Sequence, residues 1–307
     1  MNSAKTTEAV VVITNPAAGR GRGAVRGEAV VRALRDAGAL TVCVESTRPG
    51  DERRLARDAA HSGARAVAIV GGDGTIHHTA RGLLDAADEA TERPTPPLAI
   101  FSAGTGNDLV KSLGVPSHDI DAMVRRVLTG QVQAIDVGYV DEVPFVNAAG
   151  FGFDVEVLER MQRGREHGSR LEGTAAYVLT ALGALGSYRG FDMAIGDGST
   201  RRHLMAVFAN GRCFGGTFHI APEASLHDGA LDCVVIRDVP RWARIPLFMQ
   251  ATRGRHIANR RVHWSTTSGV TLRFPAPPAF ECDGERHQAG ACEVQVSVRP
   301  GALRVVV

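Results

Sequence analysis

The sequence predicts an α/β domain over residues 1–131 and a mainly antiparallel β-sandwich domain over residues 132–307. Two observations support this division. In the first part, short β-branched apolar runs alternate with helical patterns, as in a parallel sheet with helices on both faces. After about residue 130, several strand candidates alternate apolar and polar residues, which is typical of antiparallel sheets.

The first domain contains four apolar runs that we expect to be strands, at residues 9–13, 40–44, 66–70 and 97–102. Apolar residues recur at helical spacing over 25–34 and 55–60. In sheets of this kind, ligands bind at the carboxyl ends of the strands. The polar residues expected there are Asn15, Glu45, Ser46, Thr47, Asp73, Thr105 and Asp108.

The stretch Gly71-Gly72-Asp73-Gly74-Thr75 follows the third run and precedes a helical pattern. A strand, a glycine turn and a helix N-terminus form an anion site, because unpaired N–H groups and the positive end of the helix dipole face the ligand. Asp73 would repel a phosphate unless a divalent cation lay between them or the carboxylate handled a proton. We therefore predict a nucleotide-phosphate site with Mg²⁺. A tight turn capped by Asp73 is the alternative.

A second turn of this kind is Gly104-Thr105-Gly106-Asn107-Asp108. Thr105 and Asn107 can donate to phosphate or cap the helix that follows, and capping alone is the simpler interpretation. Asp108 adds a second carboxylate, and two carboxylates facing a triphosphate suit Mg²⁺ and its waters.

In the second domain we expect strands at 135–140, 144–147, 204–209, 231–236, 270–274, 293–298 and 303–307, and helices at 155–163, 172–187 and 241–251. The apolar run from Gly173 to Ser187 indicates a core helix. It could admit an acyl chain if one face lined a cleft.

Two acidic turns interrupt these strands. Asp283-Gly284 is a hairpin signal, but Asp283 and Glu285 flank it, and a carboxylate within reach of a hydroxyl can act as its general base. Asp228-Gly229 is either a plain turn or part of a structural cation site completed by backbone carbonyls.

The composition is that of a globular protein, with 44% hydrophobic and 22% charged residues. The net charge of +2 is too small to argue for nucleic acid. The five cysteines are scattered, so we expect neither a disulfide framework nor a zinc site. This cysteine usage indicates a reducing cytoplasm. We expect no signal peptide and no membrane span.

Other nucleotide-binding motifs are weak or missing. Residues 19–24 match G-x-G-x-x-A after a strand, with Glu45 as a possible ribose ligand, but a turn beside a nucleotide is favoured over an NAD site. The sequence has neither a G-x-x-x-x-G-K-[ST] loop nor an H-R-D loop, which excludes P-loop proteins and protein kinases.

Taken in order, these motifs resemble the catalytic domain of the diacylglycerol kinase and sphingosine kinase family in its soluble bacterial form. The resemblance spans about residues 8–307, although GGDGT alone is shared with NAD kinases and phosphofructokinases. The matching pieces are Asn15-Pro16 with Gly19, Thr47 with Gly50-Asp51, the two glycine turns, Asp136-Val137-Gly138, Phe145-Val146-Asn147 with 150–154, Asn210-Gly211 with Gly215-Gly216, Ala221-Pro222, Asp228-Gly229 with Leu231-Asp232, and 283–285.

The resemblance implies an ATP- and Mg²⁺-dependent lipid kinase of phospholipid biosynthesis. It would most simply convert diacylglycerol to phosphatidic acid, with ATP over the first domain and lipid in a cleft between the domains. Glu285 resembles the base, and Asp73, Asp108 and Asp283 the acidic set around Mg²⁺. Ser225, Asp228 and Ala230 match a structural cation site, the first and last through backbone oxygens. The implied ATP-binding residues are Asn15, Thr47, Gly71, Gly72, Asp73, Gly74, Thr75 and Thr105.

The sequence departs from this family at His77 and His78, where Asn-Glu is usual in bacterial members, and at Leu109, where Phe is common. The resemblance also implies a cytoplasmic enzyme that meets its lipid at the inner face of the membrane, and a homodimer. The alternatives are an NAD kinase-like enzyme and a catalytically silent module that senses nucleotide or lipid.

Overall fold

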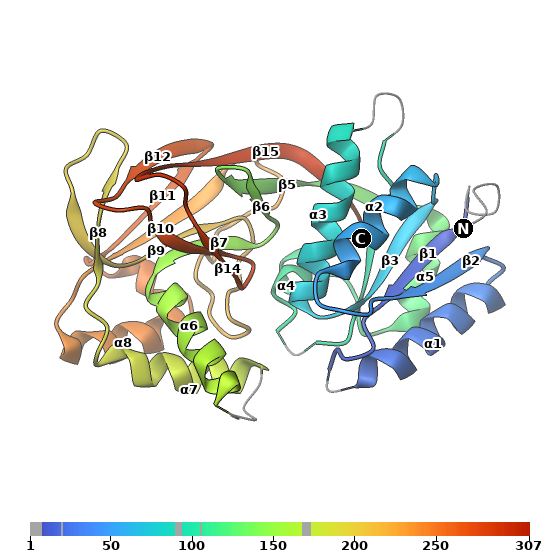
Figure 1. The fold of residues 1–307 in the computed structure, drawn as a ribbon, viewed down its shortest axis with the longest axis horizontal. Helices are drawn as coiled ribbons and strands as arrows, with labels where there is room; N and C mark the ends of the chain where they lie inside the picture. Colours follow the sequence, from blue (N-terminus) through green and yellow to red (C-terminus); the bar gives the residue numbers. More distant parts are fainter. Residues whose placement is uncertain (1–7, 20, 90–93, 105, 168–172) are drawn as a thin grey trace. The chain divides into compact units, whose positions relative to one another are not determined.

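The computed structural model describes residues 8–19, 21–89, 94–104, 106–167 and 173–307. The chain divides into two compact units, Met1–Ile135 with Gly301–Val307, and Asp136–Pro300 (Figure 1). In this division residues 301–307, which the sequence analysis places in the second domain, lie with the first unit. These residues end the long strand β15 (Glu293–Val306), whose Val305 pairs in parallel with Leu98 of the first unit.

A parallel sheet forms the centre of the first unit. Its strands are β1 (Val10–Thr14), β2 (Thr41–Glu45), β3 (Ala66–Gly71) and β4 (Leu98–Ser102). They pair in the order β2-β1-β3-β4, and the end of β15 follows β4. Every residue of β1, β3 and β4 is buried, which explains why these strands are continuous apolar runs.

Helices cover both faces of this sheet, as predicted (Figure 1). Helices α1 (Arg22–Asp36) and α5 (Ile120–Thr129) pack on the face that carries Val12 and Phe101. Val11 and Ile13 are buried on the opposite face, next to α2 (Asp51–His61) and α3 (Asp73–Glu89), which pack against each other. The short helix α4 (Asp108–Leu113) follows β4.

The strand order places a topological switch point between β1 and β3. The chain leaves β1 for its neighbour β2 on one side, and then returns to β3 on the other side of β1. Loops diverge at such a point and leave a crevice at the carboxyl ends of the strands. Asn15 follows β1 there, and Gly72 follows β3.

The second unit is a β-sandwich with a layer of helices on one side. Phe151, Phe208 and Val235 pack against Met193, Leu272 and Val294 in the core between the two sheets. The sequence predicts none of β7, β8 and β11. The strands are β5 (Val132–Val140), β6 (Val143–Phe145), β7 (Ala148–Gly152), β8 (Phe191–Ile195), β9 (Arg201–Ala209), β10 (Leu231–Arg237), β11 (Val262–Thr267), β12 (Gly269–Arg273), β13 (Ala279–Cys282), β14 (Glu285–Gln288) and most of β15.

Strand β9 illustrates how alternation builds this second unit. Ala206 and Phe208 point into the sandwich core, whereas Met205, Val207 and Ala209 belong to a second core on the other side. Helices α6 (Phe153–Glu166), α7 (Gly173–Leu185) and α8 (Arg241–Ala251) supply the rest of that second core. The short 3-10 helix η2 (Arg255–Ala258) follows α8.

None of the helices in the described part of the chain is both long enough and apolar enough to cross a bilayer.

Candidate functional site

Asp73 holds the two glycine turns of the first unit together. Its Oδ2 accepts from the N–H of Asn107 at 2.8 Å, and its Oδ1 from the N–H of Asp108 at 2.9 Å. Asn107 is the N-cap of α4 with a left-handed φ of 54°, and its own side chain does not cap the helix. The Asp73 carboxylate therefore caps a neighbouring helix, through contacts that neither sequence interpretation of the two turns predicts.

The glycines let these turns approach closely. A Cβ on Gly106 would overlap Oδ2 of Asp73, and one on Gly104 would lie 2.7 Å from Cα of Gly72. Any larger residue at either position would separate the turns. Thr105 lies outside the described residues.

Asn15 bridges the switch point of the sheet. Its Nδ2 donates to Oγ1 of Thr75 at 3.1 Å and to Oε1 of Glu52 at 3.2 Å. Glu52 is buried, and its Oε2 has no hydrogen-bond partner among the described residues. A buried carboxylate with an unused oxygen can accept a hydrogen bond from a ligand. The sequence analysis missed Glu52, because a charged residue in the first turn of a helix is common on solvated surfaces.

Thr47 lies at the neighbouring strand end, after β2. Its N–H and its hydroxyl both donate to Oδ2 of Asp51 at 3.2 Å. The N–H of Thr47, aided by the guanidinium of Arg54, lowers the pKa of Asp51 despite its burial. These hydrogen bonds order the β2–α2 loop, and the carboxylate of Asp51 anchors it.

Asp108 and the two histidines occupy the adjoining helices. Oδ1 of Asp108 lies 3.3 Å from Nζ of Lys111. His77 is buried in α3, and its ring centroid lies 5.3 Å from that of His78 in an edge-to-face arrangement. Both histidines, where the sequence departs from the family pattern, thus lie in α3.

In the second unit, Asp283 anchors a backbone turn. Its φ is 52°, and its carboxylate accepts from the N–H groups of Val146, Asn147 and Ala148 at 2.8, 2.9 and 3.1 Å. The turn is therefore fixed against the β6–β7 connection, and the exposed Glu285 that begins β14 projects from it.

A pair of buried acids lies under this turn. Glu281 and Asp154 are both buried, and Oε1 of Glu281 and Oδ2 of Asp154 have no hydrogen-bond partner among the described residues. Burial raises the pKa of Asp154 to about 7, and burial together with the Asp154 charge raises the pKa of Glu281. At neutral pH the pair therefore retains protons, and Oε2 of Glu281 accepts from the N–H of Gly284 at 2.7 Å.

The turn at residues 225–232 is held by hydrogen bonds within it and by hydrogen bonds to Asp136. Oδ1 of Asp228 accepts from the N–H of Ala230 at 3.1 Å, and Oγ of Ser225 from the N–H of His227 at 3.3 Å. Asp136 binds the N–H of Gly229 at 2.7 Å. The predicted cation ligands Ser225, Asp228 and Ala230 thus share one turn, and the cation itself remains a prediction.

The chemistry of the carboxylates indicates what kind of metal binding fits. The described residues include no group of three or more His, Cys, Asp or Glu side chains that could hold a metal ion by themselves. A Mg²⁺ ion at this position would therefore have to arrive with a phosphate and keep most of its waters, as Mg²⁺ usually does.

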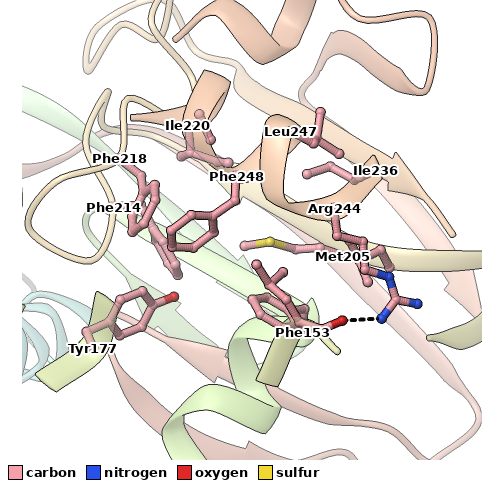
Figure 2. A pocket seen from close by; sticks show the side chains of 13 residues that line it. Phe153, Tyr177, Met205, Phe214, Phe218, Ile220, Ile236, Arg244, Leu247 and Phe248 are labelled. Carbon is pink, nitrogen blue, oxygen red and sulfur yellow. Dashed lines mark hydrogen bonds between the residues drawn. The ribbon is translucent and has the colours of Figure 1, made fainter. Parts of the chain in front are cut away.

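An apolar pocket opens in the second unit between α7, α8 and the sheet (Figure 2). Its volume is about 510 Å³, including the part open to solvent. Arg244 supplies polar atoms to its wall, but these are already used: Nη1 donates to the carbonyls of Leu185 and Tyr188 at 2.7 Å. The aromatic and aliphatic lining includes Phe153, Tyr177, Met205, Phe214, Phe218, Ile220, Leu247 and Phe248.

Comparison with known proteins covers both units. Residues 9–140 match the family model of the diacylglycerol kinase catalytic domain, and residues 147–307 that of the YegS C-terminal NAD kinase beta sandwich-like domain. A diacylglycerol kinase of Bacillus subtilis is 29% identical over 89% of this chain and 88% of its own. A protein of Cronobacter sakazakii named "Probable lipid kinase YegS-like" is 30% identical over 89% and 88%.

The fold is similar to that of a solved structure. A diacylglycerol kinase from Bacillus anthracis superimposes with a TM-score of 0.71 at 20% identity, over 97% of this chain and 96% of that one. The two family models follow each other in the same order as the two units. The relatives match this chain over most of their own length. The chain belongs to the family of lipid kinases that includes the diacylglycerol kinases and the YegS-like enzymes.

Proposed function

We propose that this chain phosphorylates the hydroxyl of diacylglycerol with ATP and releases phosphatidic acid. The family supports a lipid kinase, which implies ATP as co-substrate. The observation that carries the choice of a substrate with acyl chains is the apolar pocket of the second unit, because its open wall consists of hydrocarbon and aromatic rings.

The first unit provides the nucleotide site in this proposal. Backbone N–H groups of the turn at 71–75 would bind the phosphates, and Asn15, Thr47 and Thr105 would border them. Asp73 and Asp108 would hold Mg²⁺ through its waters, and the ion would neutralise charge on the transferred phosphoryl group. The role of this chain is then to position the phosphate chain against two turns that Asp73 fixes.

The second unit provides the acceptor. Glu285 would take the proton from the lipid hydroxyl, since it is the exposed carboxylate of the acidic turn. Asp283 would position it, because its own oxygens are occupied by three backbone N–H groups. The enzyme would be cytoplasmic and act at the inner face of the membrane, where its substrate resides.

A lipid kinase screen tests this assignment. The protein is incubated with γ-labelled ATP, Mg²⁺ and a bacterial lipid extract, and labelled lipids are identified by mass spectrometry. Phosphatidic acid is the expected product. A different phospholipid would change the substrate but keep the reaction. Formation of NADP from NAD without a lipid product would identify an NAD kinase-like enzyme, and ATP binding without transfer would identify a sensing module.

A further inference from the structure

Helix α8 exposes an apolar stripe. Trp242, Ile245 and Met249 are 73%, 56% and 55% exposed, and they recur at i, i+3 and i+7 on one side of the helix. The opposite side, which includes Leu247 and Ala251, is buried and lines the apolar pocket. Single exposed apolar residues are ordinary, but three on one side of an 11-residue helix indicate a contact surface.

The surroundings of this stripe are strongly basic. From Val239 to Phe280 the sequence has seven arginines and neither Asp nor Glu. Arg244 is buried, and Arg273 pairs with Glu293 at 3.0 Å. The other five are exposed, and none of them forms an ion pair with a described acidic residue: Arg241, Arg253, Arg255, Arg260 and Arg261.

Several of these arginines lie beside α8. The guanidinium carbon of Arg261 is 5.5 Å from the ring centroid of Trp242. Arg255, Arg260 and Arg261 line a surface hollow together with Gln250 of α8. Asn259 fixes this arrangement by donating from Nδ2 to Oε1 of Gln250 at 3.1 Å. Apolar and cationic groups therefore share one face.

Helix α7 and strand β11 also expose large apolar side chains. Helix α7 contacts α8 and exposes Leu179 and Leu182. The only other tryptophan of the chain, Trp264 on β11, is 40% exposed, and it belongs to the same acid-free segment. Tryptophan, aliphatic residues and arginine are the residues of helices that lie in a membrane interface, with the apolar side in the acyl boundary and the cations at the headgroups.

We propose that the outer face of α8, with Arg241, Arg253, Arg255, Arg260 and Arg261, docks on an anionic lipid bilayer. The proposal rests on the proposed function, because docking would bring the membrane close to the pocket assigned to the acyl chains. The inner side of α8 lines that pocket. A second copy of the chain fits less well. In a two-fold interface the same patch meets itself, and five unpaired arginines would face five others.

Vesicle co-sedimentation tests the docking directly. The full chain is mixed with vesicles of phosphatidylglycerol and phosphatidylcholine, and with vesicles of phosphatidylcholine alone. One variant carries Trp242→Ser, Ile245→Ser and Met249→Ser, and another Arg255→Glu and Arg260→Glu. The matched controls are Val25→Ser with Leu40→Ser, which are also exposed, and Arg32→Glu with Arg35→Glu on the exposed side of α1.

We expect the wild type and both controls to bind the anionic vesicles, with affinity falling as salt rises, and each α8 variant to lose about tenfold or more. In a Trp264→Phe background, the fluorescence of Trp242 should shift to the blue and be quenched by brominated lipid. Equal binding of the variants and wild type, or no binding of the wild type, would overturn the proposal. A variant that disrupts a dimer and leaves vesicle binding unchanged would assign the face to a second copy instead.

Activity on two forms of diacylglycerol separates this proposal from the proposed function. The α8 variants should phosphorylate a short-chain diacylglycerol in solution like the wild type, and lose activity only on vesicles. If no protein phosphorylates either form, the proposed function fails, while the sedimentation result still decides whether α8 docks. If the α8 variants keep full activity on vesicles, the docking proposal fails and the kinase remains.

Discussion

The carboxylate of Asp73 accepts hydrogen bonds from two backbone N–H groups that lie 34 and 35 positions further along the chain. The carboxylate of Asp283 likewise binds three N–H groups that precede it by more than 130 positions. At the scale of single residues, the hydrogen bonds of these two carboxylates position loops. Glu285 differs from both, because it is exposed on the turn that Asp283 fixes.

The buried pair Glu281 and Asp154 makes stability depend on pH. The pKa of each is raised in the folded protein, so the folded state binds more protons than the unfolded state, and stability falls as pH rises. We expect the free energy of unfolding to drop by about 2–4 kcal/mol between pH 5 and pH 8. Glu281→Gln should reduce this drop, since it removes one of the two ionisations.

Urea unfolding followed over this pH range measures the effect. Glu142→Gln is the matched control, because it makes the same change at an exposed position. If Glu281→Gln loses stability between pH 5 and pH 8 as steeply as the wild type, the ionisation of Glu281 does not contribute to the pH dependence.

At the scale of elements, the close approach of the two glycine turns is what places the N-terminus of α4 beside α3. Gly106→Ala would bring a methyl group into overlap with Oδ2 of Asp73 and displace the carboxylate. The two hydrogen bonds to Asn107 and Asp108 would then be lost, at a cost of about 1–3 kcal/mol in unfolding free energy. ATP binding should weaken with them, because the turns would separate.

Chemical denaturation and calorimetric titration with ATP check this prediction. Gly290→Ala is the control, since a Cβ there meets no atom within 4 Å. An unchanged stability and ATP affinity of Gly106→Ala relative to Gly290→Ala would show that the contact between the turns is not required.

The elements that the sequence predicts are those with a strong local signal. The buried runs of β1, β3 and β4 and the helical spacing of α6, α7 and α8 reflect periodicity within a few residues. The partners of Asp73 and the burial of Glu52 depend on contacts between distant segments, which periodicity does not encode. The same holds for β15, whose last residues belong to the first unit and pair there with β4.

At the scale of the whole molecule, the chain combines a unit that carries two glycine turns at the carboxyl ends of a parallel sheet with a unit that carries an apolar pocket. The two matched family models divide the chain in the same order, at residues 9–140 and 147–307. Each candidate site could be named from the sequence, because glycine turns and acidic turns are local motifs. The pocket could not, because its walls come from α6, α7, α8, two strands and the segment 214–220.

The central claim is that this chain transfers phosphate to a lipid hydroxyl with Glu285 as the base. The most direct measurement compares the rate of phosphatidic acid formation in the wild type and Glu285→Gln, with ATP affinity determined for both and with Glu142→Gln as the control. We predict that turnover falls by about 10²–10⁴-fold in Glu285→Gln while the affinity for ATP stays within about twofold. Turnover near the wild-type rate in Glu285→Gln would contradict the account.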